Sequence, residues 1–213
     1  MIVFPLAATL VAAAFSIATW RASRGRGMAL RIWSIALAQF AIGSAAVVWG
    51  TIFDWSDASY RVFYGFGAVL NVAWLGLGTL WLVWERSAAM VMTIVLAVVS
   101  FWAIYLVATT DFIPGAASAL AGEELPAARD VMPVLVRNLS RWFSITGSVV
   151  VLAGLGMSLA QRRNSLGIGL LAAGVVVAGV ASEFARAGYV AVFGVGLAVG
   201  IALMYAGFIR TRT

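Results

Sequence analysis

Long apolar stretches alternate with short polar segments along this chain, and this pattern is its strongest structural signal. In the stretch 60–85, no charged residue lies between Arg61 and Glu85, so one helix there is long enough to cross a bilayer. Its polar, aromatic and small residues recur at alternating spacings of 4 and 3, which indicates a helix face that contacts protein rather than lipid. These residues are Tyr60, Tyr64, Gly67, Asn71, Trp74, Gly78, Trp81 and Glu85. We therefore expect this stretch to form the central helix of a bundle.

The same pattern predicts an all-α membrane protein, a bundle of seven transmembrane helices in a single domain. The predicted spans are 2–20, 32–53, 60–85, 88–108, 133–160, 165–184 and 189–209. Hydrophobic residues make up 63% of the 213 residues and charged residues only 10%, and the mean hydropathy is +1.03. A soluble domain of this length needs more surface charge, so the lipid bilayer is the expected surrounding of the helices.

The distribution of arginine predicts the orientation of the bundle. A net charge of +6 would suggest nucleic-acid binding in a soluble protein, but here the arginines lie mostly in short segments between spans. If the N-terminus is outside, nine arginines fall on the inner side and five on the outer side. Because inner segments are the arginine-rich ones, we expect the N-terminus outside, the C-terminus inside, and no nucleic-acid partner. The expected location is a multi-pass position in a cell membrane, such as a bacterial inner membrane.

The order of the spans allows an internal duplication. Spans one to three and five to seven share an orientation, and residues 66–70 (FGAVL) are similar to residues 193–197 (FGVGL). One interpretation is a 3+1+3 repeat in which the fourth span connects two three-helix units. The alternative is chance similarity in a sequence rich in glycine and valine.

Two known topologies are similar to this one. Seven spans with the N-terminus outside resemble rhodopsins, and a 3+1+3 arrangement resembles SWEET and PQ-loop transporters. The last span has no Lys for a retinal Schiff base, and the chain has no Pro-Gln pair. The resemblance is therefore one of topology and implies no membership of either family.

Three residue types are absent from the chain, and their absence limits its chemistry. Without His or Cys there is no ligand for a haem or metal site of the His- or Cys-bound kind. Without Lys there is no Schiff base with retinal or with a carbonyl substrate. The Ser and Thr hydroxyls have no His or Lys partner to activate them. We expect no cofactor, no metal and no enzymatic activity.

The fifth span carries a polar stripe that is a candidate binding site. Arg137, Arg141, Ser144 and Ser148 follow 4, 3, 4 spacing from the predicted outer surface toward the middle of the membrane. Arginine presents a rigid fork of donors, so this stripe favours an anion or a carboxylate as ligand. The alternative is that both arginines pair with lipid phosphates or with acidic residues of the preceding loop.

Three further polar residues are candidates for the same site. Asn71 and Trp74 lie near the middle of the third span, where an amide and an indole can orient a small ligand; the alternative for Asn71 is a hydrogen bond to a neighbouring helix. Glu183 lies near the outer end of the sixth span, where partial burial would make it titratable, or where it pairs with Arg186. The hypothetical ligand-binding residues are Arg137, Arg141, Ser144, Asn71, Trp74 and Glu183.

The loop 109–132 is the only long connection between predicted spans. Loops of more than about 15 residues in compact domains tend to be lids or linkers. We expect part of this loop to fold back over the outer end of the bundle and to screen Arg137 and Arg141 with its carboxylates; the alternative is a solvated linker. The carboxylates are those of Glu123, Glu124 and Asp130.

The functional expectation combines these features. The leading hypothesis is a protein that binds or transports a small anionic or polar molecule, or an ion, through an outward-opening cavity between spans three, five and six. The alternative is a sensor or accessory subunit that binds another membrane protein or a second copy of itself and moves nothing.

Overall fold

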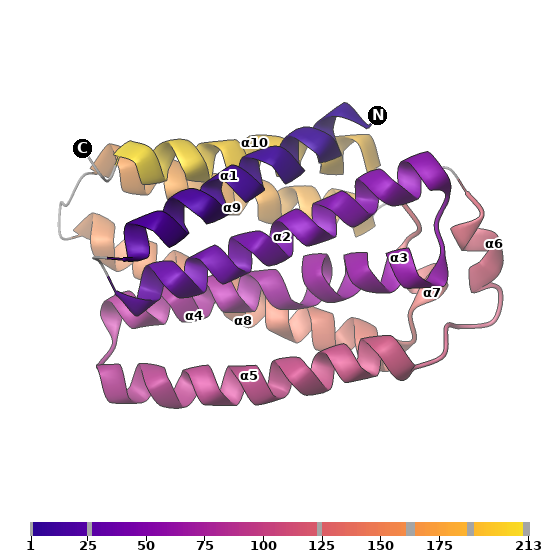
Figure 1. The fold of residues 1–213 in the computed structure, drawn as a ribbon, viewed down its shortest axis with the longest axis horizontal. Coiled ribbons are helices and arrows are strands. Elements are labelled where there is room, and N and C mark those ends of the chain that lie inside the picture. Colours follow the sequence, from indigo (N-terminus) through magenta and orange to yellow (C-terminus); the bar gives the residue numbers. More distant parts are fainter. Residues whose placement is uncertain (1, 25–26, 123–124, 161–164, 187–189, 211–213) are drawn as a thin grey trace.

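The computed structural model describes residues 2–24, 27–122, 125–160, 165–186 and 190–210. Within these residues the chain forms helices and the turns between them, with no strand. The helices are α1 (Val3–Ser23), α2 (Met28–Phe53), α3 (Asp57–Val62), the π-helix η1 (Phe63–Leu70), α4 (Asn71–Val83), α5 (Arg86–Thr109), α6 (Ala116–Leu120), α7 (Ala128–Val131), α8 (Val134–Ala160), α9 (Ser165–Arg186) and α10 (Val190–Arg210). The long helices run side by side, and α6 and α7 lie together at one end of the bundle (Figure 1).

Six helices of the described chain are long and apolar enough to cross a membrane. They are Val3–Ser23, Met28–Phe53, Asp57–Val83, Arg86–Thr109, Val134–Ser158 and Val192–Arg210. The predicted sixth span corresponds to α9, whose apolar part, Leu166–Ser182, is shorter than the others. The helical membrane class is therefore confirmed, and the chain is a multi-pass membrane protein with six helices of spanning length.

Six helical segments form a closed ring, and α5 lies outside it. Counting the continuous stretch α3, η1 and α4 as one segment, α1 packs on α2, α2 on η1 and α4, α4 on α8, α8 on α9, and α9 on α10, which returns to α1. The closest of these pairs is α9 with α10, where small residues let the backbones approach: a Cβ atom built at Gly200 would lie 2.9 Å from the Gly174 carbonyl oxygen. By contrast, α5 packs only lightly on α4, η1 and α8 (Figure 1).

Two hydrophobic cores fill the bundle. One core joins α1, α2, α8, α9 and α10 through buried residues such as Phe15, Leu37, Val151 and Leu171. The other lies toward α6 and α7 and gathers buried residues such as Tyr60. The interior of the ring between α1, α2, α8 and α10 is thus packed with apolar side chains.

The long connection folds back onto the bundle instead of forming a solvated linker. Leu120, Val131 and Met132 are buried in the same core as Tyr60, whose hydroxyl donates to the Pro126 carbonyl at 3.2 Å. This agrees with the expected cover over one end of the bundle.

None of the described carboxylates forms an ion pair with the two arginines of α8, Arg137 and Arg141. Asp130 forms an ion pair with its neighbour Arg129, at 3.6 Å, and not with Arg137 or Arg141. Glu123 and Glu124 lie outside the described residues.

The central segment begins with a capped helix and then widens. The Ser56 and Ser59 side chains form a reciprocal capping box at the start of α3. From Phe63 the backbone follows a π-helix up to Leu70, and α4 continues from Asn71. A π-helix makes i→i+5 hydrogen bonds, so each turn holds more residues than an α-helical turn. Residues that follow it therefore point in directions that 4-and-3 spacing does not predict.

The predicted protein-contacting face of this segment meets two neighbouring helices. Gly67 and Gly78 contact α2, at Gly43 and at the Trp33 indole. Trp74 instead faces α5, as does Trp81. The expectation that this face contacts protein is confirmed for these four residues, and the face meets two neighbouring helices, α2 and α5.

Candidate functional site

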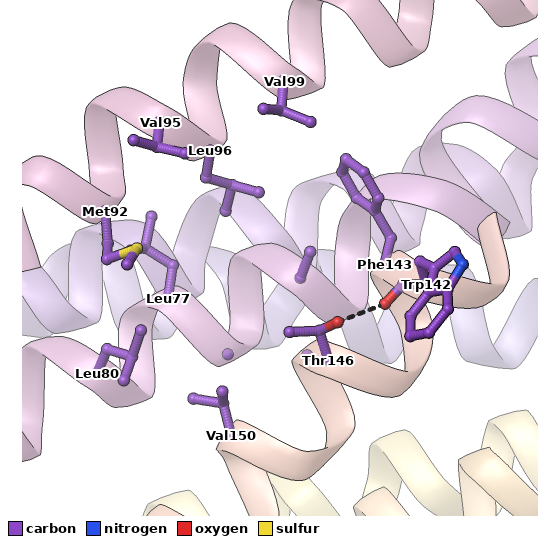
Figure 2. Close-up of a pocket in the computed structure, with 13 residues that line it drawn as sticks. Leu77, Leu80, Met92, Val95, Leu96, Val99, Trp142, Phe143, Thr146 and Val150 are labelled. Carbon is purple, nitrogen blue, oxygen red and sulfur yellow. Dashed lines mark hydrogen bonds between the residues drawn. The ribbon is translucent and has the colours of Figure 1, made fainter. Parts of the chain in front are cut away.

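A cavity of about 320 Å³ lies between α4, α5 and α8. Side chains of α5 point across it toward α4 and α8, and the Trp142 indole lies at its edge (Figure 2). The lining residues are Ala73, Gly76, Leu77, Leu80, Met92, Val95, Leu96, Val99, Trp142, Phe143, Thr146, Gly147 and Val150. In terms of the predicted spans, the cavity lies between the third, fourth and fifth. The sequence-based hypothesis placed a cavity between spans three, five and six; the third and fifth spans line this cavity, and its remaining wall is the fourth span.

Apart from the Trp142 indole N–H at its edge, the described lining of the cavity offers no unpaired polar side chain to a ligand. Its lining contains no charged residue, and the only hydroxyl is that of Thr146. This hydroxyl donates to the Trp142 carbonyl of its own helix at 2.7 Å, which Figure 2 shows as a dashed line. Apolar cavities of this kind stay dry and accept apolar guests. The cavity therefore suits a hydrophobic molecule and not the anionic or polar one expected from the sequence.

Two indole hydrogen bonds join α5 to α4 beside this cavity. The Trp74 indole nitrogen donates to Ser100 Oγ at 3.1 Å, and the Trp81 indole nitrogen donates to Thr93 Oγ1 at 2.9 Å. The two donors are seven residues apart on α4, and the two acceptors are seven residues apart on α5, as antiparallel neighbours require. These bonds hold two bulky indoles between the helices, so that α5 cannot approach α4 closely.

A third polar contact holds the other end of α5. The Arg61 guanidinium donates to the Val107 carbonyl and, at 3.0 Å, to the Thr110 carbonyl, at the C-terminus of α5. It also pairs with Asp57 and lies 4.3 Å from the centre of the Phe112 ring. A cation is favourable at a helix C-terminus, where the last carbonyls have no partner within the helix. Thus α5 is fixed along its length by polar contacts, while its apolar packing is sparse.

The sequence-predicted site residues do not line the cavity. Trp74 is engaged with Ser100, Asn71 is buried, and the Ser144 hydroxyl donates to the Ala68 carbonyl at 3.3 Å. Asn71 and Ser144 are thereby brought to the same part of the bundle, where α8 packs on the central segment.

The charged candidates are placed differently. Arg137 is half-buried, Arg141 is exposed, and the Glu183 side chain lies outside the described residues. None of the described candidate residues therefore lines the cavity between α4, α5 and α8.

Two buried amides lie at the same level on the neighbouring helices α2 and α4. Contacts of Gly43 with Gly67 and of Trp33 with Leu75 and Gly78 set the antiparallel register of the two helices. This register brings Gln39 of α2 to the level of Asn71. The two residues are 8% and 5% exposed, and the amide oxygen of each is buried with no hydrogen-bond partner among the described residues.

We predict that Asn71→Leu is tolerated. A buried acceptor without a partner costs free energy, so removing it together with its side chain should change the free energy of unfolding by no more than about 1 kcal/mol. Thermal unfolding in detergent tests this, with Ser140→Ala as a comparison, because Ser140 makes an interhelical hydrogen bond of 2.8 Å to the Ala68 carbonyl. A loss for Asn71→Leu well beyond that of Ser140→Ala would show that the amide has a partner.

The cavity wall on α5 was missed by the sequence reasoning. Met92, Val95, Leu96 and Val99 belong to a mostly apolar helix, and hydropathy alone does not separate a cavity face from a lipid face. One sequence signal could have indicated it: Thr93 and Ser100 are seven residues apart, the same spacing as the indoles of Trp74 and Trp81 in the preceding span.

Comparisons of the chain with protein-family models, with curated proteins and with solved structures find no match.

Proposed function

We propose that this protein binds a hydrophobic small molecule, or the hydrocarbon part of a lipid, in the cavity between α4, α5 and α8. The observation that supports the proposal is the cavity itself: its wall is apolar, and its only hydroxyl is bonded within its own helix. Its volume is about twice that of an engineered apolar cavity that holds benzene, so it has room for roughly a dozen carbon atoms. That size matches part of an alkyl or isoprenoid chain.

The position of the cavity within the spans supports entry from the bilayer. Met92 and Val95 line the cavity and are 41% and 49% exposed, and Trp142 at its edge is 68% exposed. Met92 and Val95 lie in a helix of spanning length, so their exposed surfaces face hydrocarbon and not water, whereas Trp142, next to Arg141, lies at the headgroup end of the cavity. A guest of the cavity therefore comes from the hydrocarbon region, where apolar chains are abundant.

The topology in this proposal has seven spans, with α9 as the shorter one, the N-terminus outside and the C-terminus inside. Arginine enrichment in the inner segments supports this orientation. A 3+1+3 organisation, with α5 as the connector, is supported by the ring: α4 packs on α8 just as α10 packs on α1. Those two contacts are equivalent if two three-helix units are related by a twofold axis.

Binding has more support than transport. A transport path through the inside of the ring would have to cross the apolar core, where Leu37, Val151 and Leu155 are buried. The cavity lies outside that ring and beside the peripheral helix α5. A binding protein, with or without a partner in the membrane, needs no such path.

The proposal is tested by filling the cavity. Thr146 lines it, whereas the next residue back, Ile145, is exposed and does not line it. We expect Thr146→Trp to displace a chain, because an indole takes up much of the free volume, and Ile145→Trp to leave it bound. The measurement uses phosphatidylcholine with a photoreactive diazirine in the middle of one acyl chain, in nanodiscs, with cross-links mapped by peptide mass spectrometry.

In the unchanged protein, cross-links should concentrate on residues 92–99 and 142–150. They should fall about tenfold in Thr146→Trp and stay the same in Ile145→Trp, since losing about 1.4 kcal/mol of binding free energy is a tenfold change. Cross-links spread evenly over all exposed apolar positions, or unchanged in Thr146→Trp, would show that no chain occupies the cavity.

A further inference from the structure

Arg137 and Arg141 lie one turn apart near the N-terminus of α8, away from the cavity between α4, α5 and α8. Like charges four residues apart on a helix repel each other unless a counter-charge lies between them. The structure shows no ion pair for either guanidinium within the described residues. The Arg137 Nε atom is moreover buried without a hydrogen-bond partner. This is a donor for which the described protein supplies no acceptor.

Two of the described carboxylates at this end of the bundle are paired with other arginines. Asp130 pairs with Arg129, and Asp57 pairs with Arg61. Ser140 and Ser144, on the turns of α8 next to the arginines, donate to the Ala68 carbonyl. Among the described residues, the two arginines are therefore left without a carboxylate partner.

The polar stripe of α8 leads from this point into the ring. Continued by the same spacing, the stripe of Arg137 and Ser144 reaches Val151 and Leu155, which are buried against residues of α1, α2, α9 and α10. The cavity-lining residues Trp142, Thr146 and Val150 lie on a different face of the helix. Arg137 is therefore half-buried toward the ring, whereas Arg141 extends to the surface.

We propose that Arg137 and Arg141 together bind an oxyanion of the phosphate class. At about 1.5 Å of rise per residue, the two lie roughly 5 and 10 Å from the start of α8. In a helix of 27 residues, which is longer than the hydrocarbon core requires, this is the depth of lipid headgroups. Guanidinium groups donate two parallel hydrogen bonds to phosphate oxygens, so an anion between the two removes their repulsion and supplies the acceptor that Arg137 Nε lacks. The phosphate can come from a lipid headgroup or from a soluble phosphate.

Native mass spectrometry of the full chain in detergent tests this site. The probe is phosphatidylglycerol, with phosphatidylcholine of the same chains as a reference for lipid binding through chains alone. We expect Arg137→Gln plus Arg141→Gln to weaken phosphatidylglycerol binding about tenfold, because two charge-assisted contacts are lost. Arg129→Gln is the matched control: it removes an arginine from the same end of the bundle, 70% exposed and already paired with Asp130.

A second arm identifies the source of the phosphate. Thermal unfolding is measured in sodium phosphate and in sodium chloride of equal ionic strength. A rise in the melting temperature with phosphate that the double variant loses identifies a soluble phosphate; no rise, together with selective loss of phosphatidylglycerol, identifies a lipid headgroup.

Equal phosphatidylglycerol binding by the double variant and the unchanged protein, with no phosphate effect on melting, would overturn the proposal. If the double variant does not fold, Arg141→Gln decides alone, since Arg141 is exposed and contributes little to packing. This site does not depend on occupancy of the cavity, and Thr146→Trp should leave phosphatidylglycerol selectivity unchanged.

Discussion

Replacing Gly43 or Gly147 with Ala is expected to lower the free energy of unfolding by about 1–3 kcal/mol, although each change adds a single methyl group. A Cβ atom at Gly43 would lie 2.6 Å from Gly67 Cα, and one at Gly147 would lie 2.6 Å from the Val72 carbonyl carbon. Both neighbours are backbone atoms, so no side-chain rotation relieves the overlap. The helices have to separate, which disturbs the packing of α2 on η1 or of α8 on α4. Chemical denaturation in detergent micelles measures the loss.

The same substitution at Gly156 and Gly169 is the matched control. Both glycines lie within helices, and nothing stands within 4 Å of a Cβ atom built on either. Alanine should be neutral there or should stabilise the helix by up to about 1 kcal/mol, since glycine is the poorer helix former. If Gly147→Ala and Gly156→Ala unfolded at the same denaturant concentration, α4 and α8 would not approach each other as closely as the structure shows.

Arg61→Gln is expected to loosen α5 and to cost about 2–3 kcal/mol. The side chain of Arg61 is 18% exposed, and its guanidinium donates to Val107 and Thr110 while pairing with Asp57. Hydrogen bonds to a charged group are worth more than neutral ones, and their loss leaves carbonyl oxygens at the end of α5 without partners. Because little apolar packing holds α5, we expect faster hydrogen exchange at its C-terminal end, measured on protein in nanodiscs.

Arg129→Gln serves as the comparison for this prediction. The side chain of Arg129 is 70% exposed and makes one ion pair at 3.6 Å, and such surface pairs contribute about 1 kcal/mol or less. Its exchange and melting should match those of the unchanged protein. Equal behaviour of the two variants would mean that α5 is held by other contacts than Arg61.

Hydropathy predicted the ends of most helices closely. The stretch 88–108 corresponds to α5 (Arg86–Thr109), and Pro133 directly precedes α8, where a missing N–H is tolerated. The exception is the start of the second span, predicted at residue 32, whereas α2 already begins at Met28. The apolar stretch that predicts this span begins only after Arg31, whereas the helix itself continues beyond the hydrocarbon into the headgroup region.

Helix neighbours were less accessible to sequence reasoning. The pattern at Tyr60–Glu85 identified residues that contact protein, but not that Gly67 and Trp74 contact different helices. Local spacing shows which residues share one face of a helix, but not how many neighbouring helices meet that face: Trp74 and Gly78 lie one turn apart on α4 and contact α5 and α2 respectively. The peripheral position of α5 was equally hidden, since its apolar residues look alike whether they face lipid, a cavity or another helix.

The sequence by itself determined that this is a helical membrane protein, where most of its helices lie and which chemistry its residues exclude. These are local properties: the bilayer requires every backbone group of a span to be bonded within its helix, so about 20 apolar residues suffice to predict one. Only the tertiary structure decided that six helical segments form a ring, that α5 is held beside it by Trp74, Trp81 and Arg61, and that an apolar cavity remains between them. Cavities depend on which faces meet and how closely. Those distances are set by glycine contacts and indole hydrogen bonds between residues far apart in the chain.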